Sequence, residues 1–246
     1  MSEPRLLLAS QSPRRRELLA VGLSADGFRS ALGISFEVAT PNVVEIPQPG
    51  ESPAALVARL SRAKAEAAWD DSPGITIRPR IPIRPRIPIR LIIACDTVVA
   101  LDDEVLGKPG EAAEATSMLC RLRGRSHSVY SAVTLLETTT RRTMTDVAET
   151  QVAMRDYTDA EVAAYVASGD PFDKAGAYAI QHTGFHPVAE LQGCYANVMG
   201  LPLCHLTRCL RAWGVVPPLY EISVPAACQA YTGHRCPVHG MILCDL

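Results

Sequence analysis

Asp96 is the residue whose type and position most clearly predict chemistry in this sequence. It interrupts the apolar segment RLIIACDTVVAL, residues 90–101, which is typical of a buried central strand. A buried carboxylate is costly unless a cation pairs with it or it binds a metal. Asp96 is therefore expected to hold a divalent metal or to activate water. The alternative is that it ends its strand and caps the following turn.

Basic side chains elsewhere in the chain predict that the ligand is an anion. Arg14 and Arg15 follow Pro13 at an expected helix start, where free backbone N–H groups and the helix dipole attract negative charge. Lys108 stands in the loop LGKPG, and Lys174 in the small-residue stretch SGDPFDKAGAYAIQ. Each of them, taken alone, is also explained as a solvated surface charge.

Together these residues meet the requirements of phosphoryl transfer. That chemistry needs cations that spread the charge of the phosphates, a metal that bridges phosphate oxygens, and a group that orients water. Lys64 adds a further cation, and Glu45 and Asp96 supply carboxylates for the metal or the water. The sequence thus predicts a phosphate site if the fold brings these segments together.

The elements that must position these residues are strands and helices in a mixed order. Strands are predicted over residues 5–10, 33–46, 90–101, 127–138 and 141–157. Helices are predicted to begin at Pro13 and to span residues 52–69, 112–124 and 158–169. Strands and helices without strict alternation predict an α/β or α+β class with a mixed sheet.

Two segments differ from the rest of the chain in composition. Residues 77–90 repeat the pattern IRPRIP, within a Pro/Arg-rich insertion of about residues 72–90 that is expected to be extended and solvated. Residues 215–246 lose periodicity and are expected to be a tail added to a domain of residues 1–214. The tail has zinc-ligand residue types without a paired CxxC spacing, so a zinc site and an ordinary or disordered tail both stay open. These residues are Cys228, His234, Cys236, His239 and Cys244.

Composition limits the class of protein further. The 246 residues are 48% apolar, enough for a sizeable core. The net charge of −2 and the pI near 6.3 argue against the positive field that drives nonspecific binding to nucleic acid. No apolar run is long enough to predict a membrane span, and no signal peptide is evident at the start, so a cytoplasmic protein with mostly buried, reduced cysteines is expected.

Five motifs in order resemble those of the Maf family, the septum-formation-inhibitor-related nucleoside triphosphate pyrophosphatases. They are LLLASQSPRRRELL, VVEIPQPGESPAALVARLSRAKA, ACDTVVALDDEVLGKP, YVASGDPFDKAGAYAIQ and NVMGLPL. The resemblance spans about Arg5 to Trp213. It implies an α/β, Maf/ITPase-like fold with an elongated mixed sheet, flanking helices and a cleft between two lobes, in a family that is often dimeric. It also implies hydrolysis of a nucleoside triphosphate to the monophosphate and pyrophosphate, with Mg²⁺ or Mn²⁺.

The resemblance also implies roles for individual residues. Asp96 matches the catalytic proton acceptor, and Glu45 and Asp96 are expected to bind the metal. The residues that match the substrate-binding positions are Ser10, Arg15, Lys64, Lys108 and Lys174. The residues that match the specificity positions are Arg14, Thr97 and Gln181, and all three have the identity found in the branch similar to dTTP/UTP pyrophosphatases. Gly176 is expected to let the backbone approach the ligand.

Alternative functions stay open at this point. One is hydrolysis of 7-methyl-GTP, and another is a nucleotide-binding regulator of cell division with little turnover. A nucleic-acid binder that uses the arginine repeat is disfavoured because the charge is balanced and aromatic residues are not interleaved. A nucleotide substrate, no stable nucleic-acid partner, no membrane and a homodimer are the expected partner assignments. The family implies removal of noncanonical nucleotides as the purpose.

Overall fold

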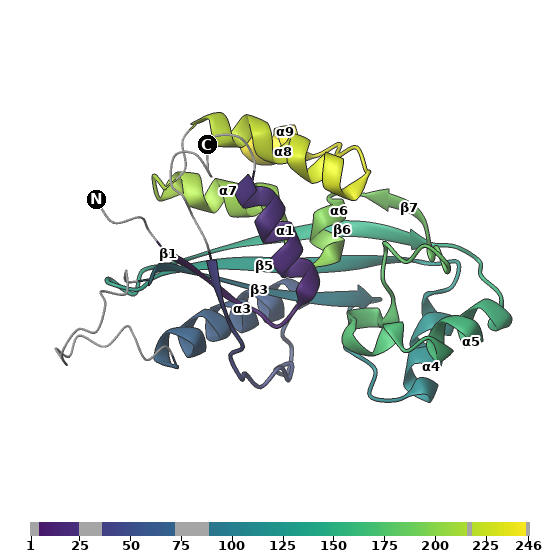
Figure 1. The fold of residues 1–246 in the computed structure, drawn as a ribbon. Helices are drawn as coiled ribbons and strands as arrows, with labels where there is room; N and C mark the ends of the chain where they lie inside the picture. Colours follow the sequence, from purple (N-terminus) through teal and green to yellow (C-terminus); the bar gives the residue numbers. More distant parts are fainter. Residues whose placement is uncertain (1–4, 25–35, 72–88, 216–217, 245–246) are drawn as a thin grey trace.

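Three long strands form the centre of a mixed β-sheet in the computed structural model, which describes residues 5–24, 36–71, 89–215 and 218–244 (Figure 1). The long strands are β3 (Ile89–Leu101), β5 (Ser126–Glu137) and β6 (Thr143–Met154). The shorter strands are β1 (Arg5–Ala9), β2 (Phe36–Ala39), β4 (Glu104–Leu106) and β7 (Val188–Gln192). Their order in the sheet is β2-β1-β3-β5-β6-β7, with β4 paired to β3.

Strand β3 has two different neighbours along the edge that faces β1. Strand β1 runs parallel to β3 and pairs with it as far as Ala94, whereas β4 is antiparallel and pairs with it from Val99 onward. Residues 95–98 therefore have no strand partner on that edge among the described strands. The opposite edge of the same residues is fully paired with β5.

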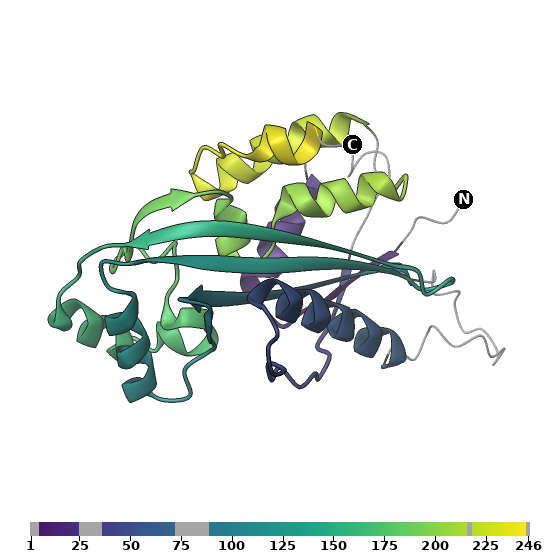
Figure 2. The same ribbon diagram turned by 180° about the vertical axis from the view of Figure 1, so that it is seen from behind.

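Helices cover both faces of the sheet, as Figures 1 and 2 show from opposite sides. The helices on one face are α1 (Pro13–Ser24), α6 (Tyr195–Met199) and α7 (Leu203–Ala212), with α8 (Pro218–Thr232) and α9 (His239–Cys244) packed outside them. Helix α3 (Pro53–Asp70) lies on the other face. Helices α4 (Ala112–Leu122) and α5 (Asp159–Ala167) gather at one end, with the 3₁₀ turns η1 (Asp170–Asp173) and η2 (Ala175–Ala177). The predicted α/β class with a mixed sheet and flanking helices is confirmed.

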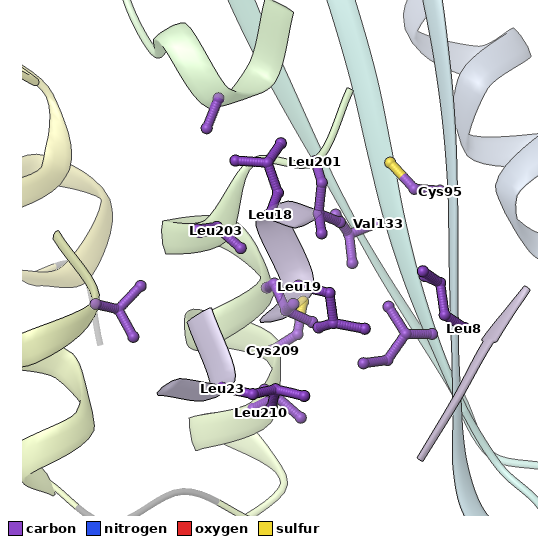
Figure 3. Packing of buried hydrophobic residues seen from close by; sticks show 14 of the residues in the cluster. Leu8, Leu18, Leu19, Leu23, Cys95, Val133, Leu201, Leu203, Cys209 and Leu210 are labelled. Carbon is purple, nitrogen blue, oxygen red and sulfur yellow. The ribbon is translucent and has the colours of Figure 1, made fainter. Parts of the chain in front are cut away.

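The core on the α1 face consists of aliphatic side chains from sheet and helices (Figure 3). Leu18 and Leu19 of α1 and Leu210 of α7 belong to one buried cluster with Cys95 and Val133 of the sheet. Because side chains alternate along a strand, the neighbouring residues of β3 point to the other face. A separate cluster forms there between the sheet and α3. Both faces of β3 are therefore buried, which explains its continuous apolar sequence.

A further cluster lies where α4 and α5 meet the end of the sheet. It joins Val99 and Leu101 of β3 to Leu119 of α4 and to Val162 and Tyr165 of α5. This lobe has its own buried side chains, distinct from the clusters beside α1 and α3. The family resemblance predicts a cleft between two such lobes.

The strand predicted over residues 33–46 is wrong beyond Ala39, where β2 ends. Residues 40–52 form a loop with no regular helix or strand. The physical reason is that Pro41, Pro47 and Pro49 lack the N–H group that a strand must donate to its neighbour. Residues 33–35 lie outside the described residues.

Of the two unusual segments, only the C-terminal one can be described. The Pro/Arg-rich insertion lies outside the described residues except for positions 89–90, which begin β3. Residues 218–244 form helices α8 and α9 rather than an aperiodic tail. Val224 is fully buried against the α1 face, and the Tyr231 hydroxyl donates a hydrogen bond to Glu17 at 2.6 Å. Among the helices described, none has the length and hydropathy needed to cross a membrane.

Candidate active site

A cavity of about 420 Å³ lies beside the stretch of β3 that is unpaired on one edge. Its walls come from the start of α1, the loop after β2, Lys108, the segment around Lys174, and the turn that ends at Gly200. Nine residues that the sequence assigns to the site line it: Ser10, Arg14, Arg15, Glu45, Lys64, Thr97, Lys108, Lys174 and Gln181. Asp96 lies directly behind Lys64. Segments from both lobes therefore face one cavity.

Asp96 is buried beside the lysine of α3. Only 4% of Asp96 is exposed, and Lys64 Nζ donates a hydrogen bond to Asp96 Oδ1. The same ammonium group forms a salt bridge with Glu45 Oε1 at 2.5 Å. Lys64 faces the sheet because it belongs to the buried stripe of α3, whose N-terminus is capped by the Ser52 hydroxyl.

The cations of the cavity act on Glu45. Burial raises the pKa of the Glu45 carboxyl, but the hydrogen bond from Lys64 and the charges of Lys64, Lys108 and Arg15 outweigh burial, so the pKa lies below its ordinary value. Glu45 is therefore a carboxylate at neutral pH. An additional anion in the cavity would meet the same positive field.

Arg15 is held by the protein on all of its nitrogen atoms. Its Nε donates to the Gly200 carbonyl at 2.9 Å and its Nη1 to the Cys95 carbonyl at 2.7 Å. Its Nη2 donates to Thr97 Oγ1 at 2.9 Å, and Thr97 Oγ1 is 2.8 Å from Ser131 Oγ. Arg15 thus gives the wall a fixed positive charge, and Thr97 orients that arginine.

A glycine is needed at position 200 for the Arg15 side chain to come this close to the backbone. Gly200 has φ +110°, and a Cβ added there would lie 3.2 Å from Arg15 Nε.

Gly176 plays a different part from the one expected. It also has a positive φ of +69°, but a Cβ there would be 3.0 Å from the Val99 side chain, and Gly176 does not line the cavity. The expectation that Gly176 approaches a ligand is replaced by a packing role against β3.

Lys174 is buried and pairs with two aspartates. Its Nζ donates to Asp173 Oδ1 at 2.5 Å and to Asp170 Oδ1 at 3.0 Å. Asp170 also accepts a hydrogen bond from the Tyr165 hydroxyl at 2.6 Å. These contacts hold Lys174 at the cavity wall. The 3₁₀ turns on either side of Lys174 therefore fix the position of its ammonium group.

Arg14 and Lys108 differ from the other cations. Among the described residues, neither side chain forms a hydrogen bond or a salt bridge, and both line the cavity. Gln181 lines it as well and is exposed. These side chains retain their hydrogen-bonding capacity for a ligand. Arg14 belongs to the first turn of α1, where the Arg15 N–H donates to Ser12 Oγ at 3.4 Å and the Arg16 N–H to the Ser12 carbonyl at 3.3 Å.

The donor atoms of the site fit a divalent cation that prefers oxygen ligands. Glu45 and Asp96 both direct a carboxylate oxygen to the Lys64 ammonium, so two hard oxygen ligands converge on a position that already holds positive charge. In the described part of the chain, no three His, Cys, Asp or Glu residues gather closely enough to bind a metal, which also applies to the tail residues within 218–244. Mg²⁺ commonly takes its other ligands from water and phosphate.

Sequence reasoning missed several residues that shape the cavity. The Gly200 carbonyl and the Ser131 hydroxyl position Arg15 and Thr97, directly or through one hydrogen bond. Asn42 and Tyr178 line the wall. The motif NVMGLPL pointed to the Gly200 turn, but a carbonyl group has no side-chain signal that a sequence could reveal.

Comparison with known proteins gives a consistent result. A family model described as Maf-like protein matches residues 5–213. A dTTP/UTP pyrophosphatase of Citrifermentans bemidjiense is 37% identical over 216 residues, which cover 88% of this chain and 99% of that protein. Proteins with the same name from Myxococcus xanthus and Salinibacter ruber are 41% and 42% identical, cover 87% and 84% of this chain, and are themselves covered to 94% and 90%.

Proposed function

This chain belongs to the Maf family, and on that basis we propose that it hydrolyses dTTP and UTP to the monophosphate and pyrophosphate. The observation that carries the proposal is the arrangement of charge in the cavity. A buried carboxylate, Asp96, stands behind Lys64, while Arg14 and Lys108 face the cavity without a partner among the described residues. A triphosphate would supply the anion that these cations lack. We assign this activity to residues 1–214, with 215–246 as an added segment.

The reaction uses water as the nucleophile. Asp96 accepts a proton from a water molecule that attacks the α phosphorus, the bond from that phosphorus to the bridging oxygen breaks, and pyrophosphate leaves. Lys108 and Lys174 offset the charge of the phosphates, and Arg15 keeps the wall positive through its fixed hydrogen bonds. Before substrate binds, Lys64 forms an ion pair with the Asp96 carboxylate.

Glu45 and Asp96 are the residues that would hold a divalent cation. When bound, the cation would polarise the phosphate oxygens and offset charge that develops on them. Two carboxylate ligands do not select between Mg²⁺ and Mn²⁺, because both ions accept hard oxygen ligands.

A neutral pyrimidine base suits the end of the cavity that Gln181 lines. The amide of Gln181 offers both a donor and an acceptor, which matches the carbonyl and imide groups of thymine or uracil. A cationic 7-methylguanine would be better served by an aromatic ring and a carboxylate. Neither residue type occupies the positions of Arg14 and Gln181.

The test is pyrophosphate release from dTTP, UTP, CTP, GTP and 7-methyl-GTP, each with Mg²⁺ or Mn²⁺. We expect dTTP and UTP to give the highest kcat/KM. A preference for 7-methyl-GTP would overturn the base assignment and keep the hydrolytic class. Binding of dTTP without turnover would favour a nucleotide-binding regulator instead.

A further inference from the structure

Glu45 lies in a loop that hydrophobic burial holds only in part. Val43 packs, partly buried, against the cluster that contains Leu56 and Leu60, whereas Val44 and Ile46, on either side of Glu45, are 73% and 70% exposed. Residues 40–52 contain no regular helix or strand. A carboxylate must nevertheless be fixed closely to serve a metal or a reacting water, since a misplacement of about 1 Å costs about 100-fold in rate. Polar contacts must therefore fix the position of the Glu45 carboxylate where hydrophobic burial does not.

Arg59 of α3 supplies those contacts. Its Nη2 donates to the Ile46 carbonyl, one residue after Glu45, at 3.0 Å. Its Nε and Nη2 also donate to the two carboxylate oxygens of Glu51, at 2.6 and 2.7 Å. Glu51 in turn accepts the Gln48 N–H at 3.0 Å, and its own N–H donates to the Gln48 carbonyl at 3.0 Å. One guanidinium group therefore ties together both ends of residues 46–51.

Helix α3 carries both this contact and Lys64. Arg59 precedes Lys64 by five positions on the same helix, whose buried residues Leu56 and Leu60 fix it against the sheet. Lys64 binds the side chain of Glu45, and Arg59 binds the backbone of the next residue, Ile46. The loop is thus attached to α3 at two points.

We infer that Arg59 is a positioning residue, which holds the Glu45 carboxylate beside Lys64 and Asp96 by binding Ile46 and Glu51. The kinetic consequence of this inference rests on the proposed function, but the structural consequence does not. The hydrogen bond from Arg59 also lowers the pKa of Glu51 to about 2, so the contact persists across the neutral range. Lysine would be a poor substitute because it lacks the planar fork that binds two oxygens.

The experiment compares Arg59→Met with a matched control. Arg121→Met removes a similar two-point arginine–glutamate contact, to Glu104 at 3.1 and 2.5 Å, between residues that do not line the cavity. We expect Arg59→Met to lower kcat for dTTP about 10-fold to 100-fold, and to raise the metal concentration needed for half-maximal activity. Arg121→Met should change neither value. Arg59→Lys should recover only part of the loss.

A double-mutant cycle shows whether Arg59 acts through Glu45. In a Glu45→Gln background, Arg59→Met should lower kcat by no more than about twofold, because the group that it positions is already lost. Equal effects of Arg59→Met in the two backgrounds would overturn the inference. An unchanged kcat for Arg59→Met in the unmodified chain would overturn it as well.

Hydrogen exchange of the backbone separates this inference from the proposed function. In Arg59→Met, amides of the peptide that spans residues 44–51 should exchange faster than in the unmodified protein, while those of β3 and β5 keep their rates. This measurement needs no substrate. If the unmodified protein releases no pyrophosphate, the proposed function fails while the exchange result still decides whether Arg59 holds the loop. Unchanged exchange in that peptide would overturn the inference whatever the activity.

Discussion

Lys64 and Asp96 form an ion pair in which only 11% and 6% of the two side chains are exposed. Glu45, whose side chain is 44% exposed, shares the same ammonium group. Removing one partner of a buried pair leaves the other charge without compensation. The pair therefore links the stability of the fold to the charge of the candidate site.

Lys64→Met should destabilise the protein because Asp96 would lose its cation while it remains buried. The expected loss is about 3 to 5 kcal/mol in the free energy of unfolding. Urea unfolding at neutral pH measures it. Lys108→Met is the matched control: Lys108 is exposed, so its loss should cost within about 0.5 kcal/mol and should instead raise KM for dTTP. Similar stability losses in the two variants would contradict the prediction.

Asp96→Asn should abolish most of the activity and leave the fold intact, because the buried Lys64 keeps Glu45 as its partner. The amide keeps the shape of the side chain but cannot take a proton from water, so kcat for dTTP should fall by about 100-fold or more. Pyrophosphate release and circular dichroism check the two parts. Asp103→Asn, in the exposed turn before β4, is the control and should retain full activity. Retained turnover in Asp96→Asn would remove this residue from the mechanism.

Two buried histidines should make the protein acid-sensitive. Burial lowers the pKa of His127 and of His205 from 6.5 to about 4. The unfolded chain takes up protons on both below pH 6.5, whereas the folded protein does so only near pH 4. Their stabilising contribution is thus complete above pH 6.5 and is lost as the pH falls toward 4. Each should account for a decrease of about 2 kcal/mol in the free energy of unfolding between pH 7 and pH 5.

Urea unfolding at the two pH values measures this decrease. His127→Gln should reduce it by the share of one histidine, since the Gln side chain does not titrate. The exposed His186 provides the control, because His186→Asn should leave the decrease unchanged. An identical decrease in His127→Gln and the unmodified protein would show that His127 does not carry the effect.

The C-terminal helices should stabilise the α1 face. Val224 of α8 is fully buried in the cluster that includes Leu18 and Leu19. Val224→Ala should cost about 2 kcal/mol in the free energy of unfolding, and truncation after Val215 should cost more. The exposed Ala226 of the same helix is the control, since Ala226→Ser should cost within about 0.5 kcal/mol. Equal stability of the truncated and full-length chains would contradict the prediction.

The sequence predicted well those elements whose patterns reflect burial. The apolar run at residues 90–101 corresponds to β3, and the amphipathic pattern at residues 52–69 to α3. Both signals arise because the core selects side chains directly. The loop after Ala39 was mispredicted since alternating apolar residues there suggested a strand, while Pro41 and its neighbours prevented pairing.

The candidate site was predictable in its side chains but not in its backbone contacts. Asp96 could be singled out because a charge inside an apolar segment is rare, and Lys64 because it matches a polar position of the family that the sequence resembles. The Gly200 and Cys95 carbonyls that hold Arg15 could not, because every residue has a carbonyl group. Arg59 was also missed, since a half-buried arginine on a helix has many ordinary explanations. The roles assigned to the site residues stay predictions.

The alternation of side chains along β3 directs two neighbouring residues of the site to different helices. Asp96 and Thr97 are consecutive, yet one contacts Lys64 on α3 and the other contacts Arg15 on α1, on opposite faces of the sheet. A substitution at Thr97 therefore changes packing against α1, while a substitution at Asp96 changes contacts with α3. Under the roles proposed above, the contribution of Thr97 to ligand preference and the chemistry of Asp96 would depend on different helices and could vary separately among relatives of this chain.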